Sequence, residues 1–355
     1  MQFGTFFALN LAMLGHFNIF SDRLAIDPGT DRTLLYSAKN GIVINEPSVI
    51  AVSTNGNSRP HIVAVGEAAG NMQGKTPAQI EVVHPIRNGA IANLEATGAM
   101  LKYFIKAGCK RRILSGFEAV IAVPSGVTHV EMEAAIEVVK SAGAGRVFLI
   151  EGPVAGALGA GLPITEPTCN MVVDIGGGTT EVAVISLGGV VSRRSVRVAG
   201  GRMNTAIINF IRRKYDLMIG DLSAEKIKTT IGTACRNPNG KETLEVKGHD
   251  LTTGMPRVIQ IGPKEIREAI SVEIGAILQT VRSVLEDLPP ELASDVLDKG
   301  ILLTGGGALL HDLDQFISEQ IGLPVSVPKN PSSTVVQGAA RVLENMDGFN
   351  QFILN

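Results

Sequence analysis

One short pattern occurs twice in this chain and constrains its fold more than any other feature. Residues 26–30 read Ile-Asp-Pro-Gly-Thr, and residues 173–179 read Val-Asp-Ile-Gly-Gly-Gly-Thr. Each copy is an apolar strand that ends in an aspartate, followed by a glycine-containing turn, a threonine and a second apolar strand. A strand–turn–strand hairpin used twice predicts two similar domains that face each other across a cleft.

Strand-like and helix-like segments alternate along the rest of the chain, which predicts α/β architecture. Short strands are expected at residues 24–26, 33–36, 42–44, 49–52, 119–123, 147–150 and 171–174. Helical periodicity predicts helices over residues 94–107 and 264–288. A further helix opens with a capping box between Thr128 and Glu131, and Gly143 marks its end.

Composition and charge exclude several function classes. The 355 residues carry a net charge of −2, so the chain has no basic footprint for nucleic acid. Three cysteines and six histidines are scattered without metal-ligand spacing, which disfavours a zinc site and indicates reduced thiols in a cytosolic protein. No Walker-type P-loop sequence is present, and no Ser/His/Asp or Cys/His set indicates a hydrolase.

The first 20 residues are rich in Phe and Leu and contain no Lys or Arg. They lack the basic start and the small-residue cleavage site of a secretory signal. Polar residues interrupt them too often for a membrane span. Two alternatives stay open: an anchor in the membrane interface, or an extension that is poorly ordered or packed on a neighbour.

The two hairpins together suit a polyphosphate and its metal ion. Glycine at a hairpin tip lets backbone amides approach a phosphate closely. Asp27 and Asp174, at the strand ends, are placed to hold a hydrated Mg²⁺ through water. Either motif alone is more often a structural turn, and only their pairing favours a nucleotide site.

A third glycine run, at residues 305–307, follows the apolar strand 301–303 and is expected to open a helix toward Ile321. Amides at a helix N-terminus favour an anion or the edge of a nucleotide. Close packing of the strand on that helix would explain the glycines equally well.

Four longer strings resemble the MreB family of bacterial actin-like, cell-shape-determining proteins. They lie at residues 41–49, 172–186, 289–295 and 303–310, and the match runs from about Leu24 to Glu344. The resemblance implies an actin-like fold with two similar domains flanking a nucleotide cleft. It implies an extension at 1–20, domain I at 21–167 plus 331–355 with a small subdomain at about 38–80, and domain II at 168–330.

The resemblance also implies ATP and Mg²⁺ as ligands and assigns their contacts. The phosphate loops are Thr30, Asp31 and Arg32 in the first hairpin, and Gly176, Gly177, Gly178 and Thr179 in the second. The ribose and base contacts are Glu225, Lys226, Ile227 and Lys228, and the adenine side is lined by Gly305, Gly306, Gly307 and Ala308. Asp27 and Asp174 face the metal, and Asp174 also serves catalysis. From the residues alone, a solvated helix face is the simpler explanation of Glu225 and Lys228.

Residues 108–117 fall where MreB proteins have a membrane-inserting loop. The resemblance implies that Ile113, Leu114 and Phe117 enter the acyl boundary while three basic residues at 110–112 meet anionic headgroups. Each such charge is worth about 1 kcal/mol near the surface. The alternative is a loop tip folded back on its own domain.

The chain departs from the family at the position that orients or activates the attacking water. The family has Glu-Glu-Pro where this chain reads Glu151, Gly152 and Pro153, and glycine cannot orient or activate a water. Because Pro153 favours extended geometry at residue 152, Glu151 is expected to point away and not to substitute. Slow hydrolysis of bound ATP follows from this.

Four other departures surround the same site. Arg202 and Asn204 stand where the family has aspartates, and Pro28 and Asp31 replace a leucine and an alanine. Pro28 removes one amide donor, and Asp31 adds negative charge beside the phosphates, which Arg32 offsets in part.

We interpret the chain as an ATP-binding, filament-forming bacterial actin homologue that is a membrane-associated scaffold for cell shape and wall synthesis. The implied partners are copies of itself, inner-membrane lipids and the cell-wall elongation machinery, with no nucleic acid. The implied location is cytoplasmic, at the inner face of the membrane. The alternative is a hydrolysis-deficient paralogue that serves as a nucleotide-holding scaffold or co-polymer, which Gly152 favours. A small-molecule kinase is disfavoured because no substrate-base carboxylate is identifiable.

Overall fold

The duplicated hairpin lies at the centre of each of two large sheets. The computed structural model of the protein describes residues 22–54, 60–109, 116–235 and 243–354. In the first hairpin, β1 (Arg23–Pro28) pairs antiparallel with β2 (Arg32–Ser37), which places Asp27 opposite Leu34. In the second hairpin, β11 (Asn170–Ile175) pairs with β12 (Thr180–Ser186), which places Asp174 opposite Glu181. The hairpin pair expected from the sequence is therefore present.

The two sheets continue from these hairpins in the same way. The first has the order β19-β10-β9-β1-β2-β3, with β3 (Gly41–Pro47), β9 (Phe117–Val123), β10 (Ala144–Glu151) and β19 (Ile353–Leu354). The second has the order β13-β12-β11-β17-β18, with β13 (Gly189–Val196), β17 (Ile301–Thr304) and β18 (Val325–Ser326). In each sheet, the first hairpin strand also pairs in parallel with a strand from later in the chain. The last described strand returns to the first sheet.

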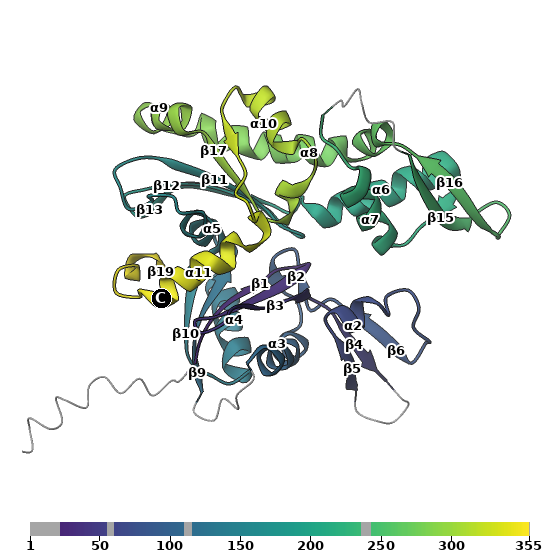
Figure 1. Cartoon of the computed structure of the whole chain (residues 1–355), viewed down its shortest axis with the longest axis horizontal. Coiled ribbons are helices and arrows are strands. Elements are labelled where there is room, and N and C mark those ends of the chain that lie inside the picture. Colours follow the sequence, from purple (N-terminus) through teal and green to yellow (C-terminus); the bar gives the residue numbers. More distant parts are fainter. Residues whose placement is uncertain (1–21, 55–59, 110–115, 236–242, 355) are drawn as a thin grey trace, which may run out of the picture.

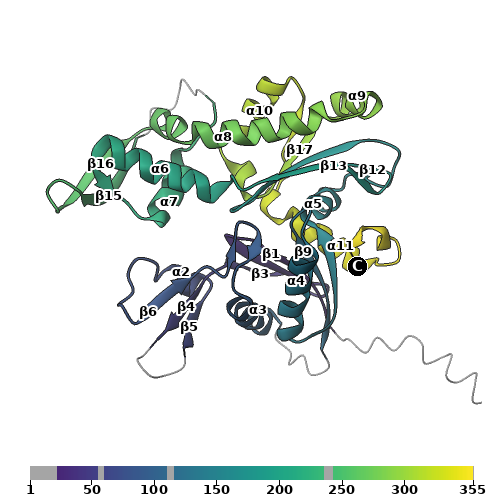
Figure 2. The same cartoon turned by 180° about the vertical axis from the view of Figure 1, so that it is seen from behind.

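Helices cover the outer faces of both sheets, and two helices lie between them (Figures 1 and 2). The first sheet packs against α3 (Leu94–Gly108) and α4 (His129–Ser141). The second packs against α6 (Gly200–Tyr215), α7 (Asp221–Ile231), α8 (Pro263–Glu286), α9 (Pro290–Lys299) and α10 (Leu313–Ile321). Between the sheets, α5 (Gly152–Ala160) and α11 (Thr334–Glu344) share one core with strands of both sheets.

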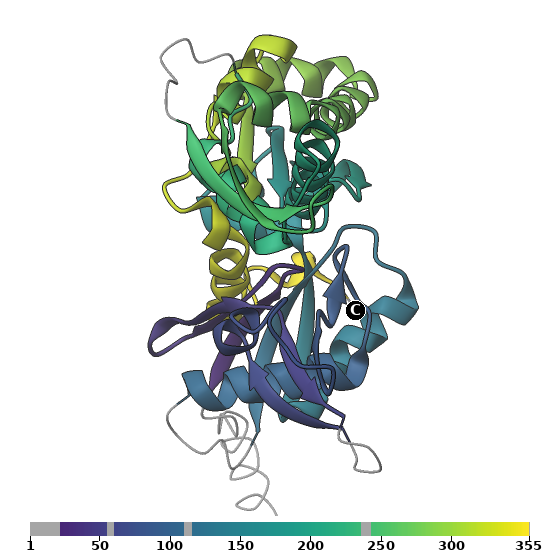
Figure 3. The same cartoon turned by 90° about the vertical axis from the view of Figure 1, so that its right-hand side faces the viewer.

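Smaller sheets project from one side of each layer (Figures 1 and 3). One contains β4 (Ile50–Ser53), β5 (His61–Val65) and β6 (Ile80–Val83), next to the short helix α2 (Glu67–Gly70). The other contains β14 (Leu217–Met218), β15 (Leu244–Asp250) and β16 (Pro256–Ile261). A two-stranded ribbon of β7 (Ile86–Arg87) and β8 (Ala90–Ile91) lies beside the first sheet. The division into domains at the residues named above stays a prediction.

The strands and long helices expected from the sequence are confirmed, and so is the capping box of Thr128 and Glu131 at the start of α4. The expectation for the third glycine run is wrong. It does not open a helix: Gly306–Leu309 form a single 3₁₀ turn, and α10 begins only at Leu313. Gly305 has φ 82° and Asp312 has φ 58°, and two residues in the left-handed region cannot belong to one continuous α-helix.

The two helices between the sheets touch backbone to backbone. A Cβ atom at Gly338 of α11 would lie 1.7 Å from the carbonyl oxygen of Ala155 in α5. A Cβ atom at Gly159 of α5 would lie 1.9 Å from the carbonyl oxygen of Thr334 in α11. Only glycine at both positions allows this approach, because neither backbone can move without displacing a sheet.

Replacing Gly338 with alanine is therefore expected to lower the free energy of unfolding by at least about 2 kcal/mol, as overpacked sites do. The matched control is Gly275→Ala in α8, where a Cβ atom would have nothing within 4 Å. That variant is expected to be up to about 1 kcal/mol more stable, because alanine favours helix. Urea unfolding of both variants measures the difference. Equal stability of the two variants would contradict the close contact.

Candidate functional site

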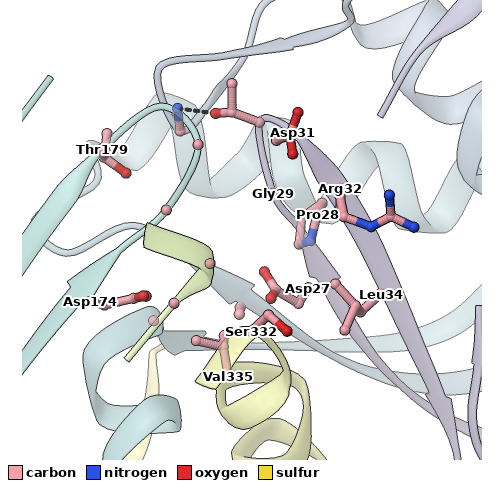
Figure 4. Close-up of a pocket in the computed structure, with 18 of the residues that line it drawn as sticks. Asp27, Pro28, Gly29, Asp31, Arg32, Leu34, Asp174, Thr179, Ser332 and Val335 are labelled. Carbon is pink, nitrogen blue, oxygen red and sulfur yellow. Dashed lines mark hydrogen bonds between the residues drawn. The ribbon is translucent and has the colours of Figure 1, made fainter. Parts of the chain in front are cut away.

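The turns of both hairpins meet in a pocket between the two sheets (Figure 4). The cavity has a volume of about 170 Å³. The first hairpin contributes residues from Asp27 to Arg32, and the second contributes Asp174, Gly176, Gly177 and Thr179. Gly305 and Gly306 line it from the loop after β17. Pro331 and Ser332, in a 3₁₀ turn directly before α11, and Val335 in the first turn of α11 also line it. The pocket is thus built from segments far apart in the sequence.

The two hairpin turns pack directly on each other. A Cβ atom at Gly178 would lie 2.4 Å from the Thr30 hydroxyl oxygen, and one at Gly177 would lie 2.6 Å from Cβ of Asp31. The Thr30 hydroxyl in turn accepts a hydrogen bond of 2.8 Å from the Gly89 amide (Figure 4). Glycine in the second turn is therefore needed for the approach of the two hairpins.

Asp27 and Asp174 face each other across the floor of this pocket (Figure 4). Burial first, and then the charge of Asp174, raise the pKa of Asp27 to about 7. Burial raises the pKa of Asp174 to about 6. In the part of the chain that the structure describes, no Lys or Arg forms an ion pair with either carboxylate. Two facing carboxylates without a cationic side chain fit a divalent cation.

The donor set also decides how such a cation would be held. Among residues 22–54, 60–109, 116–235 and 243–354, no group of three or more His, Cys, Asp or Glu side chains could ligate a metal. An ion here would therefore keep most of its waters, as Mg²⁺ does at sites with one or two carboxylates.

The third glycine run has two separate roles. A Cβ atom at Gly305 would lie 2.3 Å from an oxygen of Asp174, and one at Gly307 would lie 2.3 Å from the Ile175 side chain. These glycines let the turn pack on β11. The packing alternative named above, of the strand 301–303 on a helix opened by the glycines, does not apply, because no helix begins there. Gly306 has nothing within 4 Å of a Cβ position and lines the cavity. Ala308 is buried in the core, so its side chain cannot contact a ligand.

The residues assigned to ribose and base lie beside the pocket and not in its lining. Lys228 of α7 donates hydrogen bonds of 2.7 Å to Glu225 and 3.1 Å to the Gly200 carbonyl. Asn204 also donates to Glu225, at 2.8 Å, and its own amide oxygen is buried without a partner in the described chain. Ile227 points into the hydrophobic core and Lys226 is exposed. The assignment of the Ile227 side chain to a ligand is therefore wrong.

Asp31 connects this cluster to the first hairpin. Its pKa is raised, first by burial and then by Glu225, while Lys228 and Arg32 lower it in part. The Arg32 guanidinium donates to the side chain of Asn45 on β3, at 2.6 Å. Arg32 therefore lowers the pKa of Asp31 in part, as expected, although its guanidinium is hydrogen-bonded to Asn45 and not to Asp31.

The membrane assignment of Phe117 is wrong. Phe117 is the first residue of β9, is 1% exposed and packs in the core of the first sheet. A side chain in that core cannot insert into a bilayer while β9 stays paired. Ile113 and Leu114, with the basic residues at 110–112, lie outside the described residues.

Position 152 faces the pocket, but in a different conformation from the one expected. Gly152 is the first residue of α5, and the following Pro153 occupies the first turn of the helix, where proline is favourable. The expectation of an extended residue 152 is therefore wrong. A Cβ atom there would lie 3.7 Å from Glu181 and 4.0 Å from Asp174. The Glu151 side chain turns away, forms an ion pair with Arg193 and does not line the cavity.

Sequence reasoning missed Glu181 of β12, which lines the pocket and is 5% exposed. Burial raises the pKa of Glu181 to about 8, against the lowering effect of a hydrogen bond from the Ser125 amide. The available signal was a charged residue directly before the apolar run 182–185, on the same strand face as Thr179. The contributions of Pro331, Ser332 and Val335 had no signal in the sequence.

The fold is actin-like. Each of its two sheets is built around one copy of the hairpin, the two central helices join the sheets, and the pocket lies between the hairpin turns. The structure superposes on a chain of the MamK double helical filament with a TM-score of 0.76. The sequence identity is 19%, over 91% of this chain and 99% of the other, so the likeness shows the fold alone.

The family is narrower than the fold. A model of the MreB/Mbl protein family matches residues 21–351. Cell shape-determining protein MreB of Escherichia coli strain K12 is 46% identical over 331 residues, which cover 93% of this chain and 95% of that protein. MreB 5 of Spiroplasma citri, solved bound to AMPPNP, is 35% identical with a TM-score of 0.87, over 92% of this chain and 97% of the other. The chain belongs to the MreB/Mbl family.

Among residues 22–54, 60–109, 116–235 and 243–354, no helix is long and apolar enough to cross a bilayer.

The raised pKa of Asp27 predicts how stability depends on pH when no metal is present. Its folded pKa of about 7 exceeds the unfolded value, so its stabilising effect is full below about pH 4 and is lost as pH rises through about 7. Asp27→Asn removes this loss. The variant is expected to be more stable than the parent by roughly 1–3 kcal/mol at about pH 8, and equally stable near pH 4. Urea unfolding in the presence of a chelator measures this, and a difference independent of pH would contradict it.

Proposed function

We propose that the pocket binds Mg²⁺–ATP and that the chain assembles with copies of itself into filaments. The observation that carries the proposal is the pair of facing carboxylates, Asp27 and Asp174, between two hairpin turns that pack closely on each other through glycine. Two solved structures of MreB5 from Spiroplasma citri, one bound to AMPPNP and one bound to ADP, support the choice of nucleotide.

The described residues have distinct roles in this proposal. Thr30 and Asp31 with Gly176, Gly177 and Thr179 enclose the phosphates from both sides. Asp27 and Asp174 hold the hydrated Mg²⁺, which neutralises charge on the phosphates when bound. Gly305 and Gly306 lie on the adenine side. Glu225 and Lys228, held together by their ion pair beside Asp31, reach the ribose at the edge of the pocket.

The wider function in the proposal is that of a bacterial cytoskeletal scaffold for cell shape. The names of the relatives, cell shape-determining proteins MreB and Mbl, support it. Peripheral attachment at the inner face of the cell membrane, and contact with the wall-elongation machinery, belong to the same proposal. The two domains, 21–167 plus 331–355 and 168–330, would close around the nucleotide at the α5–α11 contact.

Hydrolysis is proposed to be slow. A positioned carboxylate that handles the attacking water supplies about 10²–10⁴-fold in rate, which is about 3–5 kcal/mol. Gly152 places only a backbone at the point where such a side chain would project beside Asp174. The second candidate function, a scaffold or co-polymer that holds nucleotide without turnover, rests on this same observation.

Removing one of the two carboxylates tests nucleotide binding. Asp174→Ala is expected to weaken the binding of Mg²⁺–ATP at least tenfold, because the cation loses one of its two protein anchors. Asp298→Ala, at an exposed position on α9, is the matched control and should bind like the parent. Titration with a fluorescent ATP analogue measures both. Unchanged affinity in Asp174→Ala would refute the site.

Because Phe117 is buried, membrane attachment through this loop is tested at Ile113 and Leu114. Replacing Ile113 and Leu114 with serine is expected to reduce co-sedimentation with anionic liposomes, because burial of each large apolar side chain contributes roughly 1.5–3 kcal/mol. The control is Val272→Ser, since Val272 is 76% exposed on α8. If only deletion of residues 1–20 abolishes co-sedimentation, the N-terminal segment is the anchor and the loop is not.

A further inference from the structure

The space next to Gly152 contains one carboxylate that no role above explains. Glu181 lines the same cavity as Asp174, and its Oε2 atom lies 3.7 Å from the position that a Cβ atom at residue 152 would occupy. The Val123 carbonyl oxygen is 3.6 Å and an oxygen of Asp174 is 4.0 Å from that same position. The Glu181 carboxyl group therefore lies in van der Waals contact with the place where a side chain from residue 152 would begin.

Both sheets hold this carboxylate in place. Glu181 belongs to β12 of the second sheet, and its Oε2 accepts a hydrogen bond of 2.9 Å from the amide of Ser125, in the loop after β9 of the first sheet. Beside it, Glu151 at the end of β10 forms an ion pair with Arg193 of β13. The position of Glu181 relative to the pocket is thus fixed only while the two sheets face each other as they do here.

The neighbouring carboxylate is not available for the same task. Glu151 is committed to Arg193 and lies within hydrogen-bonding distance of the Ser125 hydroxyl, at 3.5 Å, and it does not line the cavity. Glu181 has no Lys or Arg in an ion pair within the described chain, and Ser125 occupies only its Oε2, so its other oxygen can accept a hydrogen bond from a water in the cavity.

We propose that Glu181 positions the attacking water in this chain and carries the residual hydrolysis that remains without a side chain at residue 152. The inference rests on the proposed function, since it requires ATP in the pocket. The water donates one hydrogen bond to the Glu181 carboxylate, which aims its oxygen lone pair at the γ-phosphorus.

The reaction is then balanced without a further reactant. The water oxygen forms a bond to the γ-phosphorus, and the bond from that phosphorus to the β–γ bridging oxygen breaks, with its electron pair leaving on ADP. One proton of the water stays on the released phosphate and the other goes to solvent. Glu181 orients the water and is chemically unchanged at the end of the reaction.

The test is a double-mutant cycle of Glu181→Gln and Gly152→Glu. Glutamine keeps the size of the side chain and an oxygen that can accept from the Ser125 amide, so the fold and the cross-sheet hydrogen bond persist. Single-turnover phosphate release and the affinity for Mg²⁺–ATP are measured for all four proteins. Glu118→Gln is the control, because Glu118 is also a buried strand glutamate but pairs with Arg23 and Arg146 outside the cavity.

Glu181→Gln is expected to slow phosphate release at least tenfold while changing the affinity for Mg²⁺–ATP less than twofold. Gly152→Glu is expected to speed release at least tenfold. In the Gly152→Glu background, Glu181→Gln should lower the rate of phosphate release less than threefold, because the new carboxylate then positions the water. This non-additivity is the mark of two groups that share one task. Glu118→Gln should behave like the parent.

Two results overturn the inference. A Glu181→Gln variant that releases phosphate within twofold of the parent shows that another group positions the water. An equal loss in both backgrounds shows that Glu181 supports the structure and not the water. Failure of the proposed function has a different signature, because the parent protein then binds no Mg²⁺–ATP and the inference falls with it.

Discussion

The backbone contact between α5 and α11 is the constraint on which the pocket depends. Gly159 and Gly338 let two helices from distant parts of the chain touch without intervening side chains, and each helix shares its core with both sheets. The distance between the sheets is therefore set by peptide groups, which cannot repack as side chains do. This contact brings both hairpin turns together. The first residue of α5, Gly152, lines the pocket, and α11 begins next to Val335, which also lines it.

The pocket concentrates like charge in a place that excludes most water. Asp27, Asp174 and Glu181 all line it, and burial raises the pKa of each. Burying carboxylates close together is unfavourable unless a cation joins them, so a Mg²⁺ ion bound here would stabilise the arrangement. A site that destabilises the unliganded chain is what a ligand-driven assembly requires, because ligand binding then favours one closed arrangement of the two sheets.

Much of the fold could be predicted because its signals are local. An apolar strand, an aspartate and a glycine turn lie next to one another in the sequence, and their repetition indicated the two-sheet plan. The failures arose where tertiary contacts decide the conformation. Pro153 suits an extended neighbour and the first turn of a helix equally, and the core between the sheets selects the helix. Phe117 follows an exposed-looking basic segment, yet it starts a fully buried strand. The place of Glu181 in the pocket could not be predicted without the hairpin register, which pairs it with Asp174.

The same geometry explains how a chain can lose a side chain at residue 152 and keep its site. A glutamate there would add a fourth carboxylate beside Asp174 and Glu181, where burial and then the charge of Asp174 already raise the pKa of Glu181. Glycine at residue 152 avoids this additional repulsion and leaves Asp27, Asp174 and the two hairpin turns unchanged. Under the proposed function, binding would depend on the two hairpins and the hydrolysis rate on groups at the edge next to α5, so the two would be separable. Filaments of such a subunit would keep their nucleotide longer, because the step that limits its lifetime is the one that the glycine weakens.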